Sequence, residues 1–378
     1  MARFFKAGLL LMAMLPPSEA CAATAQRAPA GTLADGTQLE AVVLTGANQV
    51  SARILNFGAT LQALTAPDRN GVPADVLLGY DEAADYAAKG GYFGVTIGRY
   101  ANRIAGGSFA IDGNTYQVAR NSDSNALHSG PLGFDARAWR IVEMTQGAEA
   151  SVTLALTSEH GDQGYPGRVE AKVTFTLDDK GALTIAFEAS TDRPTVINMT
   201  NHAFFNLAGQ GSPEGALGHL LTIPASAITP VDAQLIPTGV LRPVEGTPFD
   251  FRTPRQPGSG VRDGHDEQIV FGRGYDHNFA LDKGLTAQPQ LAARLEHPAS
   301  GRVLEVLTTE PGIQLYTGNF LDGTVAGKNG QLYRMGDGIA LEPQKFPDAP
   351  NKPQFVSARV DPGTPYRHVM VYRLSVAR

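Results

Sequence analysis

The sequence of 378 residues is poor in several chemical groups, and each absence excludes a class of protein. Cys21 is the only cysteine, so the chain forms no internal disulfide and no zinc site built from several thiolates. The 31 lysines and arginines are outnumbered by 37 aspartates and glutamates, which gives a net charge of −6, and no basic block occurs. Because affinity for nucleic acids rests largely on clustered basic side chains, DNA and RNA are not expected as partners.

Short catalytic motifs are missing as well. The eight histidines form no HxH or HExxH pair, so the sequence has no local signature of a metal site, and no metal is expected. Neither a GxSxG elbow nor a GxxxxGK[ST] loop occurs, and the glycines of residues 91–107 lack the GxGxxG spacing. The sequence therefore contains no short motif that would indicate a hydrolase, a nucleotide-binding or a dinucleotide-binding function, and no cofactor is expected.

Residues 1–22 have the pattern of a secretory signal peptide. Arg3 and Lys6 precede an apolar run over residues 7–15, and small residues lie around a cleavage point after Ala22. Nine apolar residues are too few to cross a bilayer, which takes about 20 in a helix. We therefore expect no transmembrane segment in the mature chain and export to a bacterial periplasm.

Cleavage after Ala22 removes the only thiol and leaves residues 23–378 as the mature chain. The alternative is a lipoprotein in which Cys21 is acylated at a new N-terminus. It is disfavoured because Glu19 stands where such signals place a small or apolar residue.

Apolar and polar residues alternate with a period of two over much of the chain, which is typical of strands with one solvated face. Residues 169–177 show the pattern most clearly, and residues 183–189 repeat it after a turn, so the two segments predict a β-hairpin. Helical periodicity is scarce and is best near residues 81–88. Further strands are predicted at residues 152–156, 302–308 and 368–376.

These features predict an all-β fold, an antiparallel sandwich or barrel. No low-complexity linker divides the chain, and the glycine-rich residues 209–218 and 258–264 are expected to be surface loops. We therefore expect residues 23–378 to form a single domain. The sequence does not indicate an oligomeric state.

Polar residues are concentrated in short clusters within this apolar β sequence. In the segment 198–207, the first six positions place two amides and His202 where core residues would be expected. Glu342 follows an apolar approach and precedes Pro343, so a carboxylate is expected near the end of a buried strand. Partial desolvation would make such a group a useful base near neutral pH. A histidine bonded to backbone and a surface carboxylate are the alternative interpretations.

Four more clusters combine hydrogen-bonding side chains with glycines or aromatic residues. They lie at residues 98–107, 127–135, 275–278 and 312–320. Histidine, glutamate, amides and aromatic side chains together suit an uncharged polyhydroxylated ligand, whose hydroxyls need donors and acceptors and whose apolar faces contact aromatic walls.

In this order the clusters resemble the aldose 1-epimerase (galactose mutarotase) family, from about Leu33 to the C-terminus. The resemblance is supported by the motifs NFGA at 56–59, GYD at 79–81, GYPG at 164–167 and FDFR at 249–252. It implies a large antiparallel β-sandwich with a sugar cleft. It also implies an isomerase that interconverts the α and β anomers of free aldohexoses, such as glucose or galactose, without cofactor or metal.

The resemblance also implies roles for individual residues. His202 in the TNH motif matches the general acid, and Glu342 in the LEPQ motif matches the general base. The residues that match substrate-binding positions of the family are Asn102, Arg103, His128, Asp276 and Gln314. The expected partner is therefore a small monosaccharide.

The sequence departs from the family pattern at four positions. Phe204 stands where the family often has Tyr, Ser129 replaces a common Gly, and Pro343 and Lys345 replace residues that are often Thr and His. We expect these changes to affect sugar preference and to leave the acid and base untouched.

Three alternatives remain open. A hexose-6-phosphate 1-epimerase would need cations in the cleft, for which Arg99, Arg103 and Lys345 are candidates. A non-catalytic sugar-binding protein would not need the pair of His202 and Glu342. A glycoside hydrolase usually needs two carboxylates about 5 to 10 Å apart. The sequence offers no second carboxylate in a setting comparable to that of Glu342.

Overall fold

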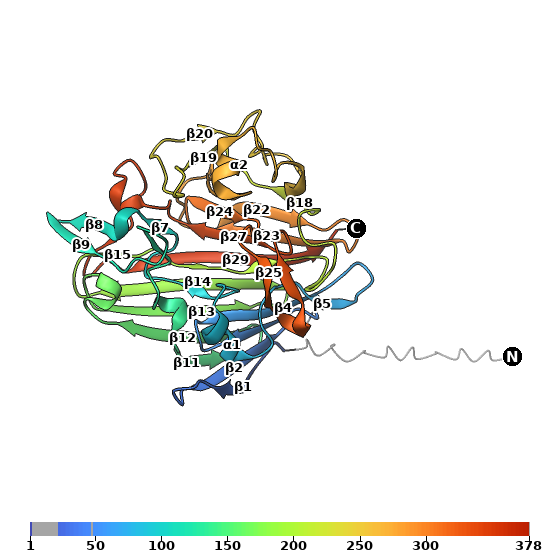
Figure 1. Ribbon diagram of the computed structural model, residues 1–378. Helices are drawn as coiled ribbons and strands as arrows, with labels where there is room; N and C mark the ends of the chain where they lie inside the picture. The colour runs from blue at the N-terminus through green and yellow to red at the C-terminus, as the bar shows by residue number, and fades with distance from the viewer. Residues whose placement is uncertain (2–21, 47, 378) are drawn as a thin grey trace.

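The structure is a computed structural model that describes residues 1, 22–46 and 48–377. The expected signal peptide therefore lies almost wholly outside the described residues. Antiparallel sheets make up most of the fold (Figure 1). The two α-helices of the described part are short, α1 (Ala83–Lys89) and α2 (Glu267–Gly272). No helix among the described residues is both long and apolar enough to span a bilayer.

The largest sheet has eight strands and forms one layer of the molecule. In spatial order they are β11 (Arg140–Thr145), β12 (Ala150–Ser158), β13 (Val169–Leu177), β14 (Ala182–Thr191), β29 (Tyr366–Val376), β23 (Arg302–Thr308), β22 (Gln290–Glu296) and β18 (Leu220–Thr222).

Two further sheets form the opposite layer. The first has five strands, β1 (Thr24–Thr32), β2 (Gln38–Thr45), β3 (Ser51–Leu55), β4 (Thr60–Pro67) and β5 (Pro73–Asp75). The second has six, in the order β17 (Phe204–Phe205), β27 (Ile339–Gln344), β24 (Gly312–Tyr316), β21 (Asp276–Ala280), β19 (Ala227–Ile228) and β20 (Arg242–Pro243). An antiparallel bridge between Leu77 and Phe205 joins them.

Five two-stranded ribbons complete the strands. They pair β6 (Thr96–Ile97) with β16 (Thr200–Asn201), β7 (Arg103–Ile104) with β10 (Ala126–Leu127), β8 (Ser108–Ile111) with β9 (Asn114–Gln117), β15 (Thr195–Val196) with β28 (Arg359–Val360), and β25 (Asp322–Ala326) with β26 (Leu332–Arg334).

The main apolar core lies between the two layers. Phe175 of the eight-stranded sheet, Val42 of the five-stranded sheet and Leu341 of the six-stranded sheet all belong to one buried cluster. The predicted antiparallel sandwich is therefore confirmed. The period-two segments are strands as predicted, with β13 and β14 forming the hairpin, and the one segment predicted to be helical corresponds to α1.

The central strands of the six-stranded sheet, β27, β24 and β21, are buried on both faces, but the two faces differ in chemistry. Along β24, Ile313 and Leu315 point into the main core, whereas Gln314 points to the other side. The same alternation places Leu341 in the core and Glu342 on the opposite face of β27. Since Gln314 is directly paired with Glu342, the register gathers polar side chains on one buried face.

Candidate active site

A cavity of about 300 Å³ opens on this polar face of the six-stranded sheet. Its size lies at the lower end of the roughly 300 to 1,000 Å³ usual for small-molecule sites. The polar residues that line it are Asn102, Arg103, His128, His202, Asp276 and Glu342. Six of the seven residues that the sequence singled out therefore come together in one place. The seventh, Gln314, is buried and does not line the cavity.

His202 is held by backbone on both sides. It lies between the short strands β16 and β17. Its N–H donates to the carbonyl of Val95, and its carbonyl accepts from the N–H of Gly94. The side chain of Asn201 donates to the carbonyl of Gly94. These bonds leave the imidazole free to project into the cavity while its main chain is fixed.

His128 is fixed by the neighbouring segment that carries Asn102. Both residues have left-handed backbone conformations, with φ of 53° and 67°. The backbone N–H of Asn102 donates to Nδ1 of His128 at 3.1 Å, and the N–H of His128 donates to the carbonyl of Asn102. Because Nδ1 accepts a hydrogen bond, the proton of the neutral ring is on Nε2. His128 therefore offers the cavity a hydrogen-bond donor.

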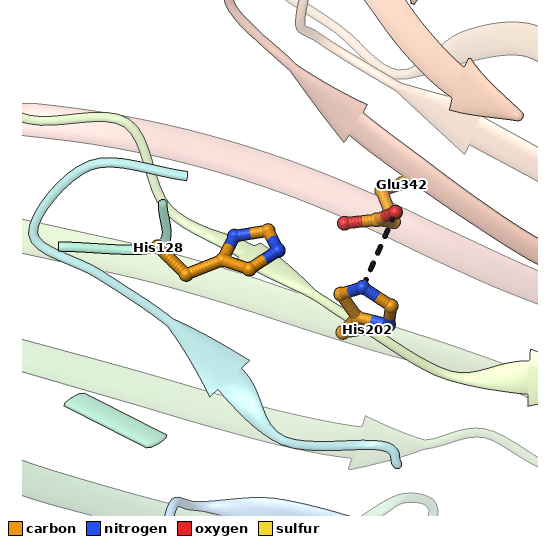
Figure 2. A group of neighbouring side chains, drawn as sticks. All are labelled: His128, His202 and Glu342. Atoms are coloured by element: carbon orange, nitrogen blue, oxygen red, sulfur yellow. Dashed lines mark ion pairs between the residues drawn. The ribbon is translucent and has the colours of Figure 1, made fainter. Parts of the chain in front are cut away.

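The two imidazoles and the carboxylate of Glu342 point into the same space (Figure 2). One possible ligand atom from each of His128, His202 and Glu342 lies within 4.8 Å of the others, so the group could be considered for a metal ion. The tautomer of His128 does not fit that role, because a metal-binding nitrogen must carry a lone pair and Nδ1 is already used by Asn102. The described residues thus fit a hydrogen-bonding site better than a metal centre.

The closest contact between the predicted acid and base is 3.5 Å, from Nε2 of His202 to Oε1 of Glu342. The two residues are 5% and 2% exposed. Burial disfavours both charged forms, so it lowers the pKa of His202 to about 4 and raises the pKa of Glu342 well above its ordinary value. Burial therefore favours the arrangement of the pair in which Glu342 is protonated and His202 is neutral.

Several buried atoms of the cavity have no hydrogen-bond partner within the described part of the chain. They are Oε2 of Glu342, Nδ1 of His202 and Nε of Arg103. A buried polar atom without a partner costs about 1 to 3 kcal/mol. Groups that remain unpaired in this way are suited to a ligand that supplies both donors and acceptors.

Asp276 is oriented by residues on both sides. Its Oδ2 lies 3.7 Å from a terminal guanidinium nitrogen of Arg103. Its Oδ1 accepts a hydrogen bond of 2.7 Å from Nε2 of Gln314. Gln314 was expected to lie in the substrate-binding cleft. The structure places it behind Asp276 and outside the cavity lining.

Aromatic and aliphatic side chains form the remaining wall. Tyr92 stacks on His202 with ring centroids 5.7 Å apart and meets His128 edge-on at 4.8 Å. Phe204 and Tyr316 also contact the His202 ring. The rest of the wall consists of Leu127, Phe320, Leu321 and Val325.

Sequence reasoning missed Tyr92. The only local signal is the preceding pair of glycines, Gly90 and Gly91, which indicates a tight turn but gives no indication of what the tyrosine contacts.

Three of the four departures from the family pattern lie outside the cavity lining. Ser129 bonds the backbone of Tyr100. Lys345 forms a buried ion pair of 3.0 Å with Glu310. Pro343 is not among the lining residues either, so only Phe204 faces the cavity. Of the four departures, only Phe204 is therefore placed where it can affect sugar preference.

An antiparallel sandwich with a buried imidazole and a buried carboxylate side by side at a small pocket is typical of an enzyme that moves protons on a small polar molecule. The aldose 1-epimerase family matches residues 40–373. The galactose mutarotase of Mus musculus is 46% identical over 87% of this chain and 92% of its own. The aldose 1-epimerase of Escherichia coli is 36% identical over 90% of this chain and 96% of its own.

A solved structure agrees with the sequence relatives. The galactose 1-epimerase of Lactobacillus acidophilus superposes with a TM-score of 0.83 at 26% identity, and the match covers 94% of this chain and all of the other. The chain belongs to the aldose 1-epimerase family. The predicted family and enzyme class, an aldose 1-epimerase, are confirmed.

The position of Lys345 gives a test that separates stability from specificity. Lys345→Met leaves the carboxylate of Glu310, which is 1% exposed, without its cation. We expect a loss of about 3 to 5 kcal/mol in unfolding free energy, measured in urea, with the ranking of sugars unchanged. The double variant Lys345→Met/Glu310→Gln removes the unpaired charge and should recover most of the loss. A changed sugar ranking in the double variant would contradict this assignment.

Proposed function

We propose that the protein interconverts the α and β anomers of free aldohexoses, with galactose and glucose as the first candidates. The observation that carries this proposal is the pair of His202 and Glu342, 3.5 Å apart at one cavity of monosaccharide size. The name of the mouse relative, galactose mutarotase, supports galactose as a substrate.

The reaction needs a base at the C1 hydroxyl and an acid at the ring oxygen. Glu342 accepts the proton from O1 while protonated His202 gives a proton to O5, so the C1–O5 bond breaks and an aldehyde forms. Rotation about the C1–C2 bond presents the other face of the aldehyde. The same two groups then act in reverse to close the ring, and no atom is gained or lost.

Burial of the pair favours one stage of this cycle. Ring opening converts the ion pair of Glu342 carboxylate and His202 imidazolium into two neutral groups. The neutral form is the one that desolvation stabilises, since burial raises the pKa of Glu342 and lowers that of His202. The site is thus arranged to stabilise the open-chain stage. Hydrogen bonds from sugar hydroxyls to the unpaired Oε2 of Glu342 would offset the cost of the ionised form.

The other predicted residues would bind and orient the sugar. His128 and Arg103 offer donors, and Asp276 offers an acceptor. The rings of Tyr92 and Tyr316 offer flat surfaces for the apolar faces of a pyranose.

A phosphorylated hexose fits this cavity less well. Of the three candidate cations, Arg99 is buried against Ser158 and backbone carbonyls, and Lys345 is paired with Glu310. Only Arg103 lines the cavity, and it lies beside Asp276. Phosphate groups are usually bound by several converging cations or backbone N–H groups, so we favour the unphosphorylated sugar.

We also propose that the chain is exported, with cleavage after Ala22 and a periplasmic mature form. The support is the pattern of residues 1–22 alone. N-terminal sequencing of protein recovered from the periplasm of an expressing bacterium is expected to begin at Ala23. A start at an acylated Cys21, or retention of Met1, would contradict the proposal.

Polarimetry of freshly dissolved α-galactose and α-glucose tests the proposed activity, with hexose 6-phosphates as the comparison. We expect faster mutarotation of the free sugars. Glu342→Gln and His202→Asn should each lower the rate about 10²- to 10⁴-fold, because each removes one proton-transfer group. Sugar affinity, measured by calorimetry, should stay within a few-fold of the wild-type value.

The matched controls are Glu188→Gln and His265→Asn, which change exposed side chains of the same types. They should retain wild-type rates. Near-wild-type rates in either active-site variant would contradict the assigned pair. Sugar binding without acceleration by the wild-type protein would instead indicate a non-catalytic sugar-binding protein.

The pH dependence of kcat/KM follows from the buried pair. The active free enzyme holds one proton on the pair, so activity should fall on the acid side near pH 4, where His202 takes up a second proton. On the alkaline side it should fall where Glu342 loses its proton, above the ordinary range of a carboxyl group. Initial polarimetric rates, corrected for buffer catalysis, measure both limbs. An acid limb between about pH 6 and 7, the ordinary range of histidine, would contradict this account.

A further inference from the structure

Behind the cavity lies a chain of buried amides that ends on Asp276. Nε2 of Gln344 donates to Oε1 of Gln314 at 3.2 Å and to Oδ1 of Asn278 at 3.3 Å. Nε2 of Gln314 then donates to Oδ1 of Asp276 at 2.7 Å. Gln344 is fully buried and Gln314 is 3% exposed. The chain therefore runs from a residue outside the cavity lining to a carboxylate inside it.

The sheet register places the side chains of this chain of amides next to one another on one face of the sheet. Asn278, Gln314 and Glu342 are directly opposite one another on β21, β24 and β27. Gln344 lies two residues beyond Glu342 on the same face of β27, where it is paired with Gly312. A Cβ atom at position 312 would collide with Oδ1 of Asn278, so glycine leaves the space that this amide occupies.

Gln314 has two carboxylates within reach of its side chain. Asp276 accepts its amide hydrogen now, and Glu342 is its direct cross-strand partner on the same face. Oppositely paired residues have Cβ atoms about 4.5 to 5.5 Å apart, so the amide could also turn toward Glu342. Gln344 opposes that rotation, because it holds Oε1 of Gln314 in place.

We propose that Gln344 is a positioning residue of the active site, which acts through Gln314 to aim Asp276 at the ligand and to keep the Gln314 amide off Glu342. Gln344 does not line the cavity, so it acts only through the amide that it orients. This inference rests on the proposed epimerase activity.

The consequence for Glu342 has a definite sign. A hydrogen bond from an amide N–H stabilises the ionised carboxylate and therefore lowers its pKa. By keeping the Gln314 amide away, Gln344 preserves the high pKa that burial gives to Glu342. Loss of Gln344 should then move the alkaline limb of the kcat/KM profile to lower pH.

Other titratable groups also face Glu342, and none of them is substituted in the variants. From the neighbouring elements they are Arg103, His128, His202, Asp276, Tyr316 and Tyr372. Because none of them is substituted, a shift of the limb reports on the Gln314 amide together with the Asp276 carboxylate that this amide orients.

The test compares Gln344→Met with Gln62→Met. Methionine keeps the length of the side chain and removes its hydrogen bonds. Gln62 is likewise buried, its side chain donates to two backbone carbonyls and accepts from Arg53, and it does not line the cavity. For Gln344→Met we expect KM to rise about fivefold, since Asp276 loses its fixed orientation. We also expect the alkaline limb to fall by about half a pH unit or more. Gln62→Met should leave both unchanged.

A second substitution at the same position keeps the inference falsifiable if Gln344→Met folds poorly, and a double variant tests whether the effect passes through Gln314. Gln344→Glu offers an acceptor, which draws the amide of Gln314 away from Glu342. Its negative charge also disfavours ionisation of Glu342. The alkaline limb of the kcat/KM profile should therefore not move to lower pH in this variant. In a Gln314→Met background the amide is gone, and adding Gln344→Met should no longer move the limb.

Equal alkaline limbs in wild type and Gln344→Met, with both enzymes active, would overturn the inference. So would a shift that persists in the Gln314→Met background. Absence of activity in the wild-type protein would instead count against the proposed function.

Discussion

Two ionisable side chains, His202 and Glu342, buried beside each other at one cavity, are the constraint on which the rest of the structure depends. Transfer of a lone charge into such surroundings costs several kcal/mol, and removing both charges by one internal proton transfer avoids that cost. The 3.5 Å between His202 and Glu342 allows such a transfer directly or through a bound hydroxyl. Because the pair is neutral overall in either arrangement of its proton, it can remain buried and still react.

The fold holds this pair on rigid elements. Glu342 lies within β27, which is hydrogen-bonded to β24 and β17, and its neighbour Leu341 is anchored in the main core. His202 is fixed by backbone bonds to Val95 and Gly94. The sandwich core therefore contributes the stability, while the opposite face of one of its sheets accepts unpaired polar atoms.

Much of the architecture was predictable from local pattern. The alternation in residues 169–177 and 183–189 fixes which face is buried, and the hairpin of β13 and β14 follows from it. The set of site residues was predictable only because several short motifs resembled one family. Tyr92 was missed, because its stacking on His202 depends on contacts between segments about a hundred residues apart.

The interaction partners of Lys345 and Gln314 could not be predicted from the sequence either. Lys345 looked like a candidate for ligand binding, yet it pairs with Glu310 from another part of the chain. Gln314 looked like a cleft residue, yet it acts behind Asp276. Pairing of this kind is set by sheet register and by the packing of layers, and neither is encoded within a short window of sequence.

The charges of the cavity sum to zero, which bears on what it binds. Arg103 is balanced by Asp276, and the pair of His202 and Glu342 is neutral when it holds one proton. A dianionic phosphate would bring two negative charges to a site with one cation, already held by a carboxylate, and would disfavour the ionised form of Glu342. A neutral sugar leaves the balance intact and can satisfy the unpaired atoms with its hydroxyls. The same burial that makes the acid and base reactive thus also selects an uncharged ligand.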